Sequence, residues 1–467
     1  MTLLIISPDY ASHLYPLATL GTAWQEAGER VVVATGPATA DIVAAFGFER
    51  INLQLGRGSN PGVIRAEEQP LGEDDALRGF FDATRAGMVE TLTFQAEARS
   101  SDLLYNPVEI GREVQRIVRD LAPDHIIVDH LAFSARIALV SAGVAHADVV
   151  LGHPSALPVG DEVYGFPPAW PAAFRPDDET LARLRAVCDD VRDTFTAQWN
   201  AAMVELDRPV PDSSREPGSD GESGSDGEPG RDGRRAPSTD AFAESGDLLL
   251  LNYPGELHDP ARIARLPPHA FLGSSVRTEP ADPVVDEWLA RSDDRIAYVS
   301  FGSFLSVRTD VLARVAAAFR GLGVRVAIAT GSGSPADLPE LPADWLVRPF
   351  LPQVRLLGRS AVAVTHGGNN SVTEAMSAAV PLLVLPFSTD QFAGAEAIEA
   401  AGVGEALAPN TASVDDIRWS LERLLARSRG EGPGADAGFA RLSLIAAALA
   451  ERTGPQRARD ALLAASS

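Results

Sequence analysis

The stretch THGGNNSVTEAM, from Thr365 to Met376, decides how the second half of this chain folds. A short apolar run from Ala361 to Thr365 precedes it and predicts a buried strand, and a helical pattern follows it to about Ala379. The first backbone N–H groups of a helix have no partner inside the helix, and the helix dipole makes that end positive. A strand, a glycine turn and a helix start therefore predict a phosphate site that needs no Lys.

Polar side chains surround this predicted anion site. Gly367 and Gly368 allow the backbone to approach a ligand closely. Glu374 follows one helical turn later, where a carboxylate is placed to accept hydrogen bonds from a pair of ribose hydroxyls. The side chains that supply donors are His366, Asn370 and Ser371. An ordinary strand-to-helix connection, with Asn and Ser as caps, explains the same letters, so this short stretch alone leaves both interpretations open.

A second strand strengthens the interpretation as a binding site. The run from Pro381 to Phe387 is apolar and predicts a strand, and Asp390 and Gln391 follow it. Open α/β sheets bind ligands at the carboxyl ends of their strands. Both side chains are therefore expected at the edge of the sheet where a ligand would lie.

The region from Trp345 to Gly404 resembles the donor-binding signature of the family 1 glycosyltransferases, which use nucleotide-sugars and have the GT-B fold. Three positions depart from the plant form of the signature. Phe350 stands where the family usually has a Trp that stacks on the base, and Asn369 and Gly394 replace a Trp and an Asn. The matching residues, at the family's spacing, are Phe350, Pro352, Gln353, His366, Gly368, Asn370, Ser371, Glu374, Pro386, Asp390 and Gln391.

The resemblance implies a role for each group of matching residues. Phe350 and Gln353 would hold the base, and Asp390 and Gln391 would bind sugar hydroxyls. No metal is needed in this arrangement, and the sequence predicts none. The groups that would stabilise the leaving nucleoside diphosphate are the helix start, His366, Ser371 and Ser303.

Strands and helices alternate along the rest of the chain, and the β-α-β start predicts an α/β fold with a doubly wound parallel sheet. The resemblance extends this to GT-B, in which two Rossmann-like domains face a cleft. The expected boundaries are an acceptor-binding domain at 1–275, a donor-binding domain at 283–435, and a C-terminal helix at 436–467 that returns to the first domain. Residues of about 211–240 are rich in Gly, Ser, Pro and acids and predict a disordered insertion.

If the second domain holds an activated sugar, the first must supply a base, and His13 is the leading candidate. It follows the first strand, and a neutral imidazole has a suitable pKa to take a proton from an alcohol. Asp129 ends the strand DHIIVD at the same sheet edge, where a carboxylate would orient the imidazole and compensate its charge. The family pattern places its catalytic His and Asp at these two positions.

Other interpretations of these residues remain open. His13 could be a helix residue with no reaction partner, and Asp129 could cap the helix that follows it. The aromatic stretches at 80–94 and 164–174 either line the acceptor side or pack in the core. Weaker candidates for the base are His130, His125 and His153.

Composition narrows the class of protein. The 467 residues carry a net charge of -24 with no basic run, which argues against nucleic acid as a partner. The single Cys188 excludes an internal disulfide, and acid pairs such as Asp415 and Asp416 predict solvated surface. The chain start has no signal-peptide pattern, and no apolar stretch reaches the length of a membrane span. We expect a cytoplasmic monomer or homodimer.

The resemblance to the family, together with the candidate base His13, implies an inverting glycosyltransferase that moves a sugar from UDP-glucose or a TDP-sugar to a hydroxyl of a small apolar acceptor, such as a polyketide or a phenolic natural product. The nucleotide-sugar is a substrate, and no cofactor is expected. One alternative is a sugar-nucleotide epimerase or hydrolase of the same architecture, which would need carboxylates near the sugar in place of His13. Another is a non-catalytic sugar-nucleotide-binding helper protein, which would not depend on His13.

Overall fold

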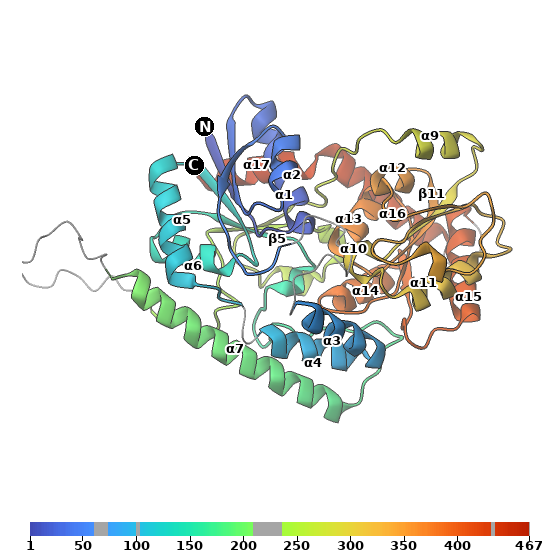
Figure 1. The fold of residues 1–467 in the computed structure, drawn as a ribbon, viewed down its shortest axis with the longest axis horizontal. Helices are drawn as coiled ribbons and strands as arrows, with labels where there is room; N and C mark the ends of the chain where they lie inside the picture. The colour runs from blue at the N-terminus through green and yellow to red at the C-terminus, as the bar shows by residue number, and fades with distance from the viewer. Residues whose placement is uncertain (60–72, 100–102, 209–235, 431–434, 467) are drawn as a thin grey trace, which may run out of the picture.

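Two parallel β-sheets divide the chain into two lobes that lie side by side (Figure 1). The computed structural model describes residues 1–59, 73–99, 103–208, 236–430 and 435–466. Most of the insertion predicted at about 211–240 lies outside the described residues. No helix in the described part of the chain combines the length and the apolar character needed to cross a membrane.

The first lobe is built on a seven-stranded sheet in the order β3-β2-β1-β4-β5-β6-β7, with every neighbouring pair parallel. Both faces of the central strand β1 are buried, and they face different cores. Leu3 and Ile5 pack with one hydrophobic cluster, and Leu4 and Ile6 pack with another. The strands are β1 (Thr2–Ile6), β2 (Arg30–Thr35), β3 (Glu49–Asn52), β4 (His125–Asp129), β5 (Ala147–Val150), β6 (Leu248–Leu251) and β7 (His269–Phe271).

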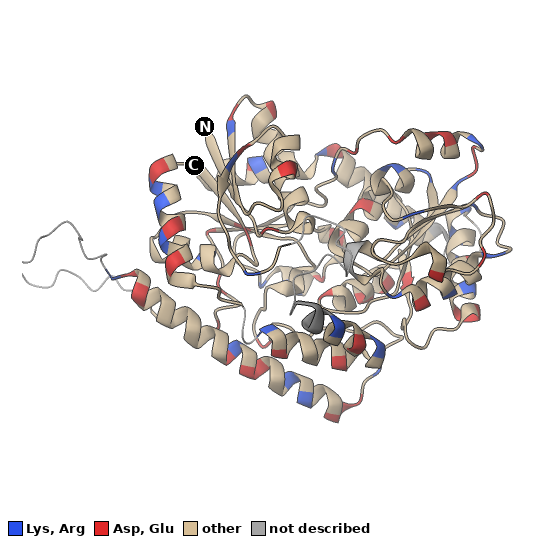
Figure 2. Cartoon of the chain, viewed as in Figure 1, with Lys and Arg blue, Asp and Glu red and all other residues tan. Residues whose placement is uncertain are grey.

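Helices cover both faces of this sheet, as the strand pattern predicted. Helices α5 and α6 pack together, and α1 packs on β1 and β2. The long helix α7 carries acidic and basic side chains along its length (Figure 2). The helices of the first lobe are α1 (Ala11–Glu26), α2 (Ala40–Ala45), α3 (Glu73–Ala86), α4 (Met88–Arg99), α5 (Pro107–Leu121), α6 (Phe133–Ser141), α7 (Asp178–Leu206) and α8 (Pro260–Ile263).

The second lobe is built on a six-stranded parallel sheet in the order β10-β9-β8-β11-β12-β13. Its strands are β8 (Ile296–Ser300), β9 (Val326–Ala329), β10 (Leu346–Arg348), β11 (Ser360–Thr365), β12 (Leu382–Val384) and β13 (Gly404–Ala406). Its helices are α9 (Pro283–Ala290), α10 (Gly302–Leu305), α11 (Thr309–Phe319), α12 (Gln353–Leu357), α13 (Asn369–Ser377), α14 (Gln391–Ala400) and α15 (Val414–Ser428). The predicted strand and helix around the Thr365 turn are thus β11 and α13.

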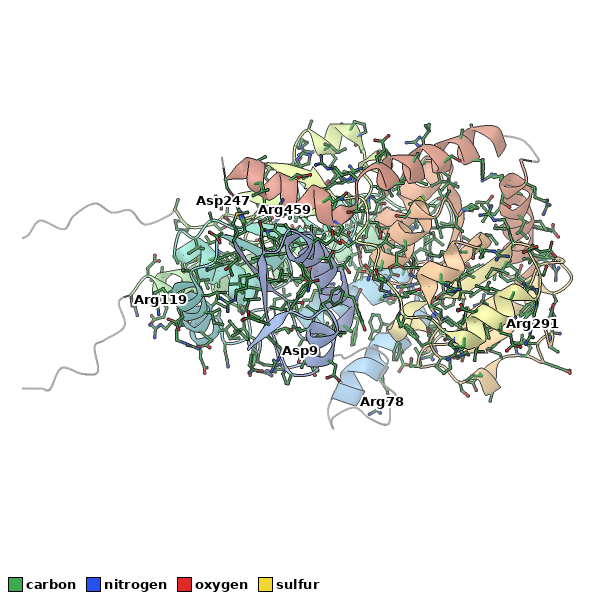
Figure 3. All side chains as sticks on the ribbon, turned by 90° about the horizontal axis from the view of Figure 1, so that it is seen from above. Asp9, Arg78, Arg119, Asp247, Arg291 and Arg459 are labelled. Carbon is green, nitrogen blue, oxygen red and sulfur yellow. The ribbon has the colours of Figure 1, made fainter. Side chains whose placement is uncertain are left out.

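The C-terminal segment, for which the sequence analysis expected one helix at 436–467, contains two helices, α16 (Ala435–Glu451) and α17 (Gly454–Ala465). The break follows from local chemistry, because Thr453 and Gln456 form a capping box and Pro455 lies in the first turn of α17. Helix α16 packs on α13 and α15 of the second lobe, whereas α17 packs on α1, β6 and β7 of the first. Arg459 of α17 donates to Glu29 at 2.8 Å and lies with the first lobe (Figure 3).

Helices α3 and α4 belong to the first half of the chain but lie against the second lobe (Figure 1). Phe80 is buried in the hydrophobic cluster of the second sheet, with Phe81 and Phe94 packed against it. Of the two interpretations of the 80–94 aromatics, core packing therefore describes these three rings.

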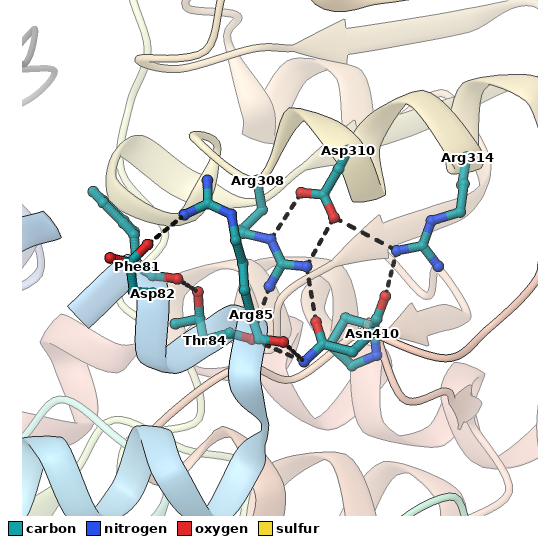
Figure 4. A network of polar contacts seen from close by, with 9 residues as sticks. Phe81, Asp82, Thr84, Arg85, Arg308, Asp310, Arg314 and Asn410 are labelled. Carbon is teal, nitrogen blue, oxygen red and sulfur yellow. Dashed lines mark hydrogen bonds and ion pairs between the residues drawn. The ribbon is translucent and has the colours of Figure 1, made fainter. Parts of the chain in front are cut away.

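A buried guanidinium holds α3 in this place (Figure 4). Arg308 is 2% exposed and donates to the carbonyl oxygen of Thr84 at 2.9 Å and to Asn410 at 2.8 Å. It also forms two hydrogen bonds with Asp310. Asn410 in turn donates to the Thr84 carbonyl at 2.9 Å. At this contact, polar groups of one lobe thus supply hydrogen-bond partners for polar groups of the other.

Candidate functional site

A cavity of about 260 Å³ lies at the carboxyl ends of β4 and β5, where the two lobes meet. The first lobe supplies most of the wall, and Thr389 and Asp390 of the second lobe close it. The polar residues that line it are His13, Arg99, Asp129, His130, Ser155, Tyr164, Thr389 and Asp390. This position agrees with the rule that open parallel sheets bind ligands beyond the carboxyl ends of their strands.

His13 and Asp129 form a direct pair in this cavity. Nδ1 of His13 lies 2.8 Å from Oδ2 of Asp129, and the imidazole is 25% exposed whereas the carboxylate is 1% exposed. The other carboxylate oxygen, Oδ1, accepts from the backbone N–H of Leu131 at 2.8 Å. An ionised carboxylate only accepts, so the proton sits on Nδ1 and Nε2 keeps its lone pair. The sequence could not give the distance between the His13 and Asp129 side chains, and the structure shows that it is the length of a hydrogen bond.

The pKa of His13 reflects two opposing effects. Burial lowers it, but the charge of Asp129 and its hydrogen bond raise it more, and the charge of Asp390 adds to that increase. The net result is a pKa raised above the 6.5 of a free histidine. The imidazole is thus basic enough to take a proton and is stabilised when it holds one.

Helix α13 brings the second lobe to this imidazole. Its first residues, Asn369 and Asn370, follow Gly368, and the Nδ2 of Asn370 lies 3.5 Å from the carbonyl oxygen of Ser12. That contact joins the start of α13 to the residue next to His13. Gly367 has a φ of +90°, a conformation that L side chains rarely adopt, so glycine is required for the turn into the helix.

Three predicted donor-site residues form one cluster behind the start of α13. Gln353 donates to Glu374 at 2.6 Å, and Ser371 donates to Gln353 at 3.4 Å. Glu374 is 5% exposed, and burial raises its pKa, against the lowering effects of the Arg277 charge and the Gln353 hydrogen bond. The structure thus joins residues from α12 and α13 that lie 18 to 21 positions apart.

His366 lies between the turn and the short helix α10. A Cβ on Gly368 would lie 2.4 Å from Nε2 of His366, and one on Gly302 would lie 3.0 Å from Cε1, so both glycines make room for this ring. Burial lowers its pKa to about 4, so the ring is neutral near pH 7. Its Nδ1 is buried and has no hydrogen-bond partner among the described residues. Ser303 lies in α10.

Asp390 and Gln391, predicted together as sugar-binding residues, have different surroundings. The Oδ2 of Asp390 accepts from the backbone N–H of His153 in the first lobe at 2.5 Å, and its carboxylate faces the cavity. Gln391 is 7% exposed and accepts from the backbone N–H groups of Phe387 and Ser388. The side-chain amide of Gln391 therefore forms hydrogen bonds with the turn at Phe387 and Ser388, and its contact with a sugar stays a prediction.

The remaining predicted residues differ in their exposure and in whether they line the cavity. Phe350 is 62% exposed, so its ring is available to stack on a planar ligand. Of the weaker base candidates, His130 lines the cavity, whereas His125 does not. His153 bonds Ser155 through its ring, and burial together with the charges of His258 and Arg262 holds its pKa well below 6.5. A base role therefore fits His13 better than His153.

The sequence analysis missed three polar residues of the cavity, Arg99, Ser155 and Thr389. Arg99 ends α4, and none of the three belongs to a motif that the sequence analysis used. Of the aromatic stretch at 164–174, Tyr164 and Phe166 line the cavity. Trp170 and Phe174 pack instead against Phe392 of the second lobe. No group of three or more His, Cys, Asp or Glu side chains suited to a metal ion occurs within the described residues.

Comparison with known proteins confirms the resemblance to the family 1 glycosyltransferases. Residues 261–429 match the family model described as UDP-glucoronosyl and UDP-glucosyl transferase. The chain is 33% identical over 174 residues to a myricetin 3-O-rhamnosyltransferase of Crocosmia x crocosmiiflora, and 29% identical over 169 residues to an oleandomycin glycosyltransferase of Streptomyces antibioticus. These alignments cover 35% and 36% of this chain and 38% and 37% of the two relatives, so the chain matches well under half the length of each.

Solved structures cover the whole chain and confirm the predicted GT-B fold. The glycosyltransferase VinC, solved in complex with dTDP, matches with a TM-score of 0.64 and 18% identity, over 100% of this chain and 99% of VinC. The spinosyn forosaminyltransferase SpnP matches with a TM-score of 0.64 and 16% identity over 100% of both chains. At these sequence identities the comparison shows the fold, and the substrates have to be argued from the residues of the site.

Proposed function

We propose that this chain is an inverting glycosyltransferase that moves a sugar from a UDP- or TDP-sugar to a hydroxyl of a small, largely apolar acceptor. The observation that carries the proposal is the 2.8 Å pair of His13 and Asp129 in a cavity that the second lobe closes with Asp390. The family match of residues 261–429 supports a nucleotide-sugar as the donor. The oleandomycin glycosyltransferase among the sequence relatives supports a natural product as the acceptor.

The proposed reaction is a single displacement. The acceptor hydroxyl gives its proton to Nε2 of His13 while its oxygen bonds to the anomeric carbon. The bond from that carbon to the phosphate oxygen breaks, and the nucleoside diphosphate leaves with the electron pair. Attack opposite the leaving group inverts the configuration. Asp129 keeps Nδ1 protonated and stabilises the imidazolium that forms.

The second lobe would stabilise the leaving group. The first backbone N–H groups of α13, which have no partner within the helix, and the helix dipole would attract the diphosphate. His366 is neutral near pH 7, so it would donate one N–H to a phosphate oxygen rather than supply a charge. The buried Gln353–Glu374 pair would meet the nucleoside, with the exposed ring of Phe350 against the base. No protein-bound metal or cofactor is part of this proposal.

A hydrolase of the same architecture is the second candidate, because the Asp390 carboxylate shares the cavity with His13. Water would then take the place of the acceptor hydroxyl. Incubation with UDP-glucose or TDP-glucose and a panel of phenolic and polyketide acceptors separates the two, since a transferase yields a glycoside and a hydrolase yields free sugar. Nucleotide binding with neither product would favour the helper protein.

The base is tested by His13→Ala. The rate of transfer should fall by about 10²- to 10⁴-fold, the usual contribution of a general base, while calorimetry finds the affinity for UDP or TDP unchanged. His269→Ala is the matched control, because this histidine is in β7 of the same sheet and bonds the carbonyl of Pro267 outside the cavity. A His13→Ala enzyme with the activity of the wild type would refute the assignment.

A further inference from the structure

The cavity contains a cationic side chain that the proposed chemistry does not use. Arg99 ends α4 and lines the cavity that His13 and Asp129 line. Its guanidinium carbon lies 5.1 Å from the centre of the Tyr164 ring, so the group stacks on the face of that ring. Its Nη1 lies beside the backbone of Gly165.

Among the described residues, this guanidinium has no anionic partner. Arg99 is partly buried, yet it makes no hydrogen bond or ion pair with any of the described residues. Cys188, which lies within reach of its charge, does not neutralise it, because burial raises the pKa of that thiol to about 11. A guanidinium withdrawn from water without a partner is costly unless a ligand supplies the missing acceptors.

The neighbouring Arg185 shows how an arginine in this region is otherwise satisfied. Its guanidinium carbon lies 5.5 Å from the centre of the Phe166 ring, which also lines the cavity. However, Arg185 donates to the carbonyl oxygen of Asp161 at 2.7 Å and lies 3.6 Å from Asp189. Arg99 has the same stacking geometry without these partners.

The two carboxylates of the cavity are held by other groups. Asp129 is bound by His13 and by the N–H of Leu131. Asp390 accepts from the N–H of His153 and from the hydroxyl of Thr389. Arg99 therefore provides an attractive place for a negative charge on the ligand, along a wall that also presents Tyr164 and Phe166.

We propose that Arg99 binds a carboxylate on the acceptor, so that the preferred acceptors are small aromatic hydroxy acids. This inference rests on the proposed glycosyltransferase function and specifies its acceptor. The planar guanidinium offers parallel N–H donors that match a carboxylate, and its position on the Tyr164 face leaves its edge for that contact. The cavity volume of about 260 Å³ is just below the usual range for drug-sized ligands and suits a compact acceptor.

The test compares acids with their esters. The kcat/KM for transfer from UDP-glucose or TDP-glucose is measured with 4-hydroxybenzoate, 4-hydroxycinnamate and their methyl esters. For the wild type we expect at least about a tenfold preference for an acid over its ester. Arg99→Gln should lower the value for the acid by about 10- to 100-fold and leave that for the ester within about twofold.

Two further variants and a binding measurement complete the design. Arg185→Gln is the matched control and should retain the preference for the acid, because that guanidinium is already bound within the protein. Arg99→Lys should recover part of the preference for the acid, since lysine keeps the positive charge but lacks the planar pair of N–H donors. Calorimetry of the acids with the donor-free wild type and with Arg99→Gln reports binding without turnover.

The outcomes separate this inference from the proposed function. If phenols or esters are glycosylated but neither acid is preferred by the wild type, the role of Arg99 is refuted and the transferase stands. Equal loss for acid and ester in Arg99→Gln also refutes it. If no acceptor is glycosylated with any donor, the proposed function itself fails. Weaker calorimetric binding of the acids to a folded Arg99→Gln enzyme supports the inference even then.

Discussion

The variant Asp129→Asn is predicted to inactivate the enzyme although it changes a single atom type. Asp129 bonds two partners, the His13 imidazole through Oδ2 at 2.8 Å and the N–H of Leu131 through Oδ1 at 2.8 Å. An asparagine here keeps its carbonyl oxygen on the Leu131 N–H, because that group needs an acceptor. Its NH₂ group then faces Nδ1 of His13 and can only donate.

That reversal forces the imidazole into the wrong tautomer. With Nδ1 as the acceptor, the ring proton moves to Nε2, the nitrogen that should take the proton of the acceptor. Loss of the charge-assisted bond alone is worth about 1.5–3 kcal/mol, or roughly 10- to 150-fold in rate. The wrong tautomer adds to this, so we expect a total loss of about 10³- to 10⁴-fold in kcat.

The variant Asp129→Ala separates the effect of the wrong imidazole tautomer from the effect of losing the hydrogen bond. Without a donor opposite Nδ1, the ring is free to protonate on either nitrogen, so this variant should retain more activity than the isosteric Asp129→Asn. The assay is initial-rate transfer with saturating donor and acceptor, with UDP and TDP affinities measured by calorimetry. An Asp129→Asn enzyme within about tenfold of the wild-type kcat, or more active than Asp129→Ala, would contradict this mechanism.

Four further predictions concern the lobe contacts and the base. Arg308→Ala should lower the free energy of unfolding in urea by about 2–3 kcal/mol, because the buried Thr84 carbonyl loses one of its two donors and Asn410 and Asp310 lose their charge-assisted hydrogen bonds. The exposed Arg183→Ala should change it by under about 0.5 kcal/mol. Gly152→Ala places a Cβ 2.6 Å from Oδ2 of Asp390 and should lower kcat/KM by about tenfold, measured against both substrates. Since the pKa of His13 is raised, kcat/KM should fall as pH drops through a pKa above 6.5. The same shift makes His13 stabilise the fold below pH 6.5, with that contribution lost as pH rises through the raised pKa, so His13→Ala should cost more stability at pH 5.5 than at pH 8.5.

Each of these has a result that would overturn it. Equal unfolding curves for Arg308→Ala and wild type would show that the contact in Figure 4 does not stabilise the folded chain. Unchanged kinetics for Gly152→Ala would mean that Asp390 need not approach β5 during turnover. A flat kcat/KM between pH 5.5 and 8.5 would remove His13 as the titrating base. An equal loss of stability in His13→Ala at pH 5.5 and pH 8.5 would contradict the raised pKa of His13.

The core strands were predictable because their composition is unambiguous. The segments that became β1, β2, β4 and β11 each contain an unbroken run of three or four apolar residues, as expected of strands buried on both faces. The edge strand β3 (Glu49–Asn52) was missed, because its side chains are half-buried or exposed and lack an apolar run. The three-residue strands β7 and β13 were missed because, unlike the equally short β12, they lie in no long continuous apolar run.

The pairing of distant residues in the site could not be read from the sequence. His13 and Asp129 are 116 positions apart, and only the adjacent parallel strands β1 and β4 bring the ends of their segments together. The pairs formed by Asn370 with Ser12 and by Asp390 with His153 span both lobes. Such contacts depend on how the lobes dock, which local patterns do not encode.

The sequence by itself determined the strand and helix rhythm, the glycine turn before α13 and the resemblance to the family, because these depend on residue types at short range. Only the tertiary structure decided that Phe80 packs in the second lobe, that the Gln391 amide hydrogen-bonds its own turn, and that Arg99 lines the cavity without a hydrogen-bond partner among the described residues. The physical reason is that burial and hydrogen-bond partners are properties of the folded surroundings, whereas propensity and period are properties of neighbouring residues.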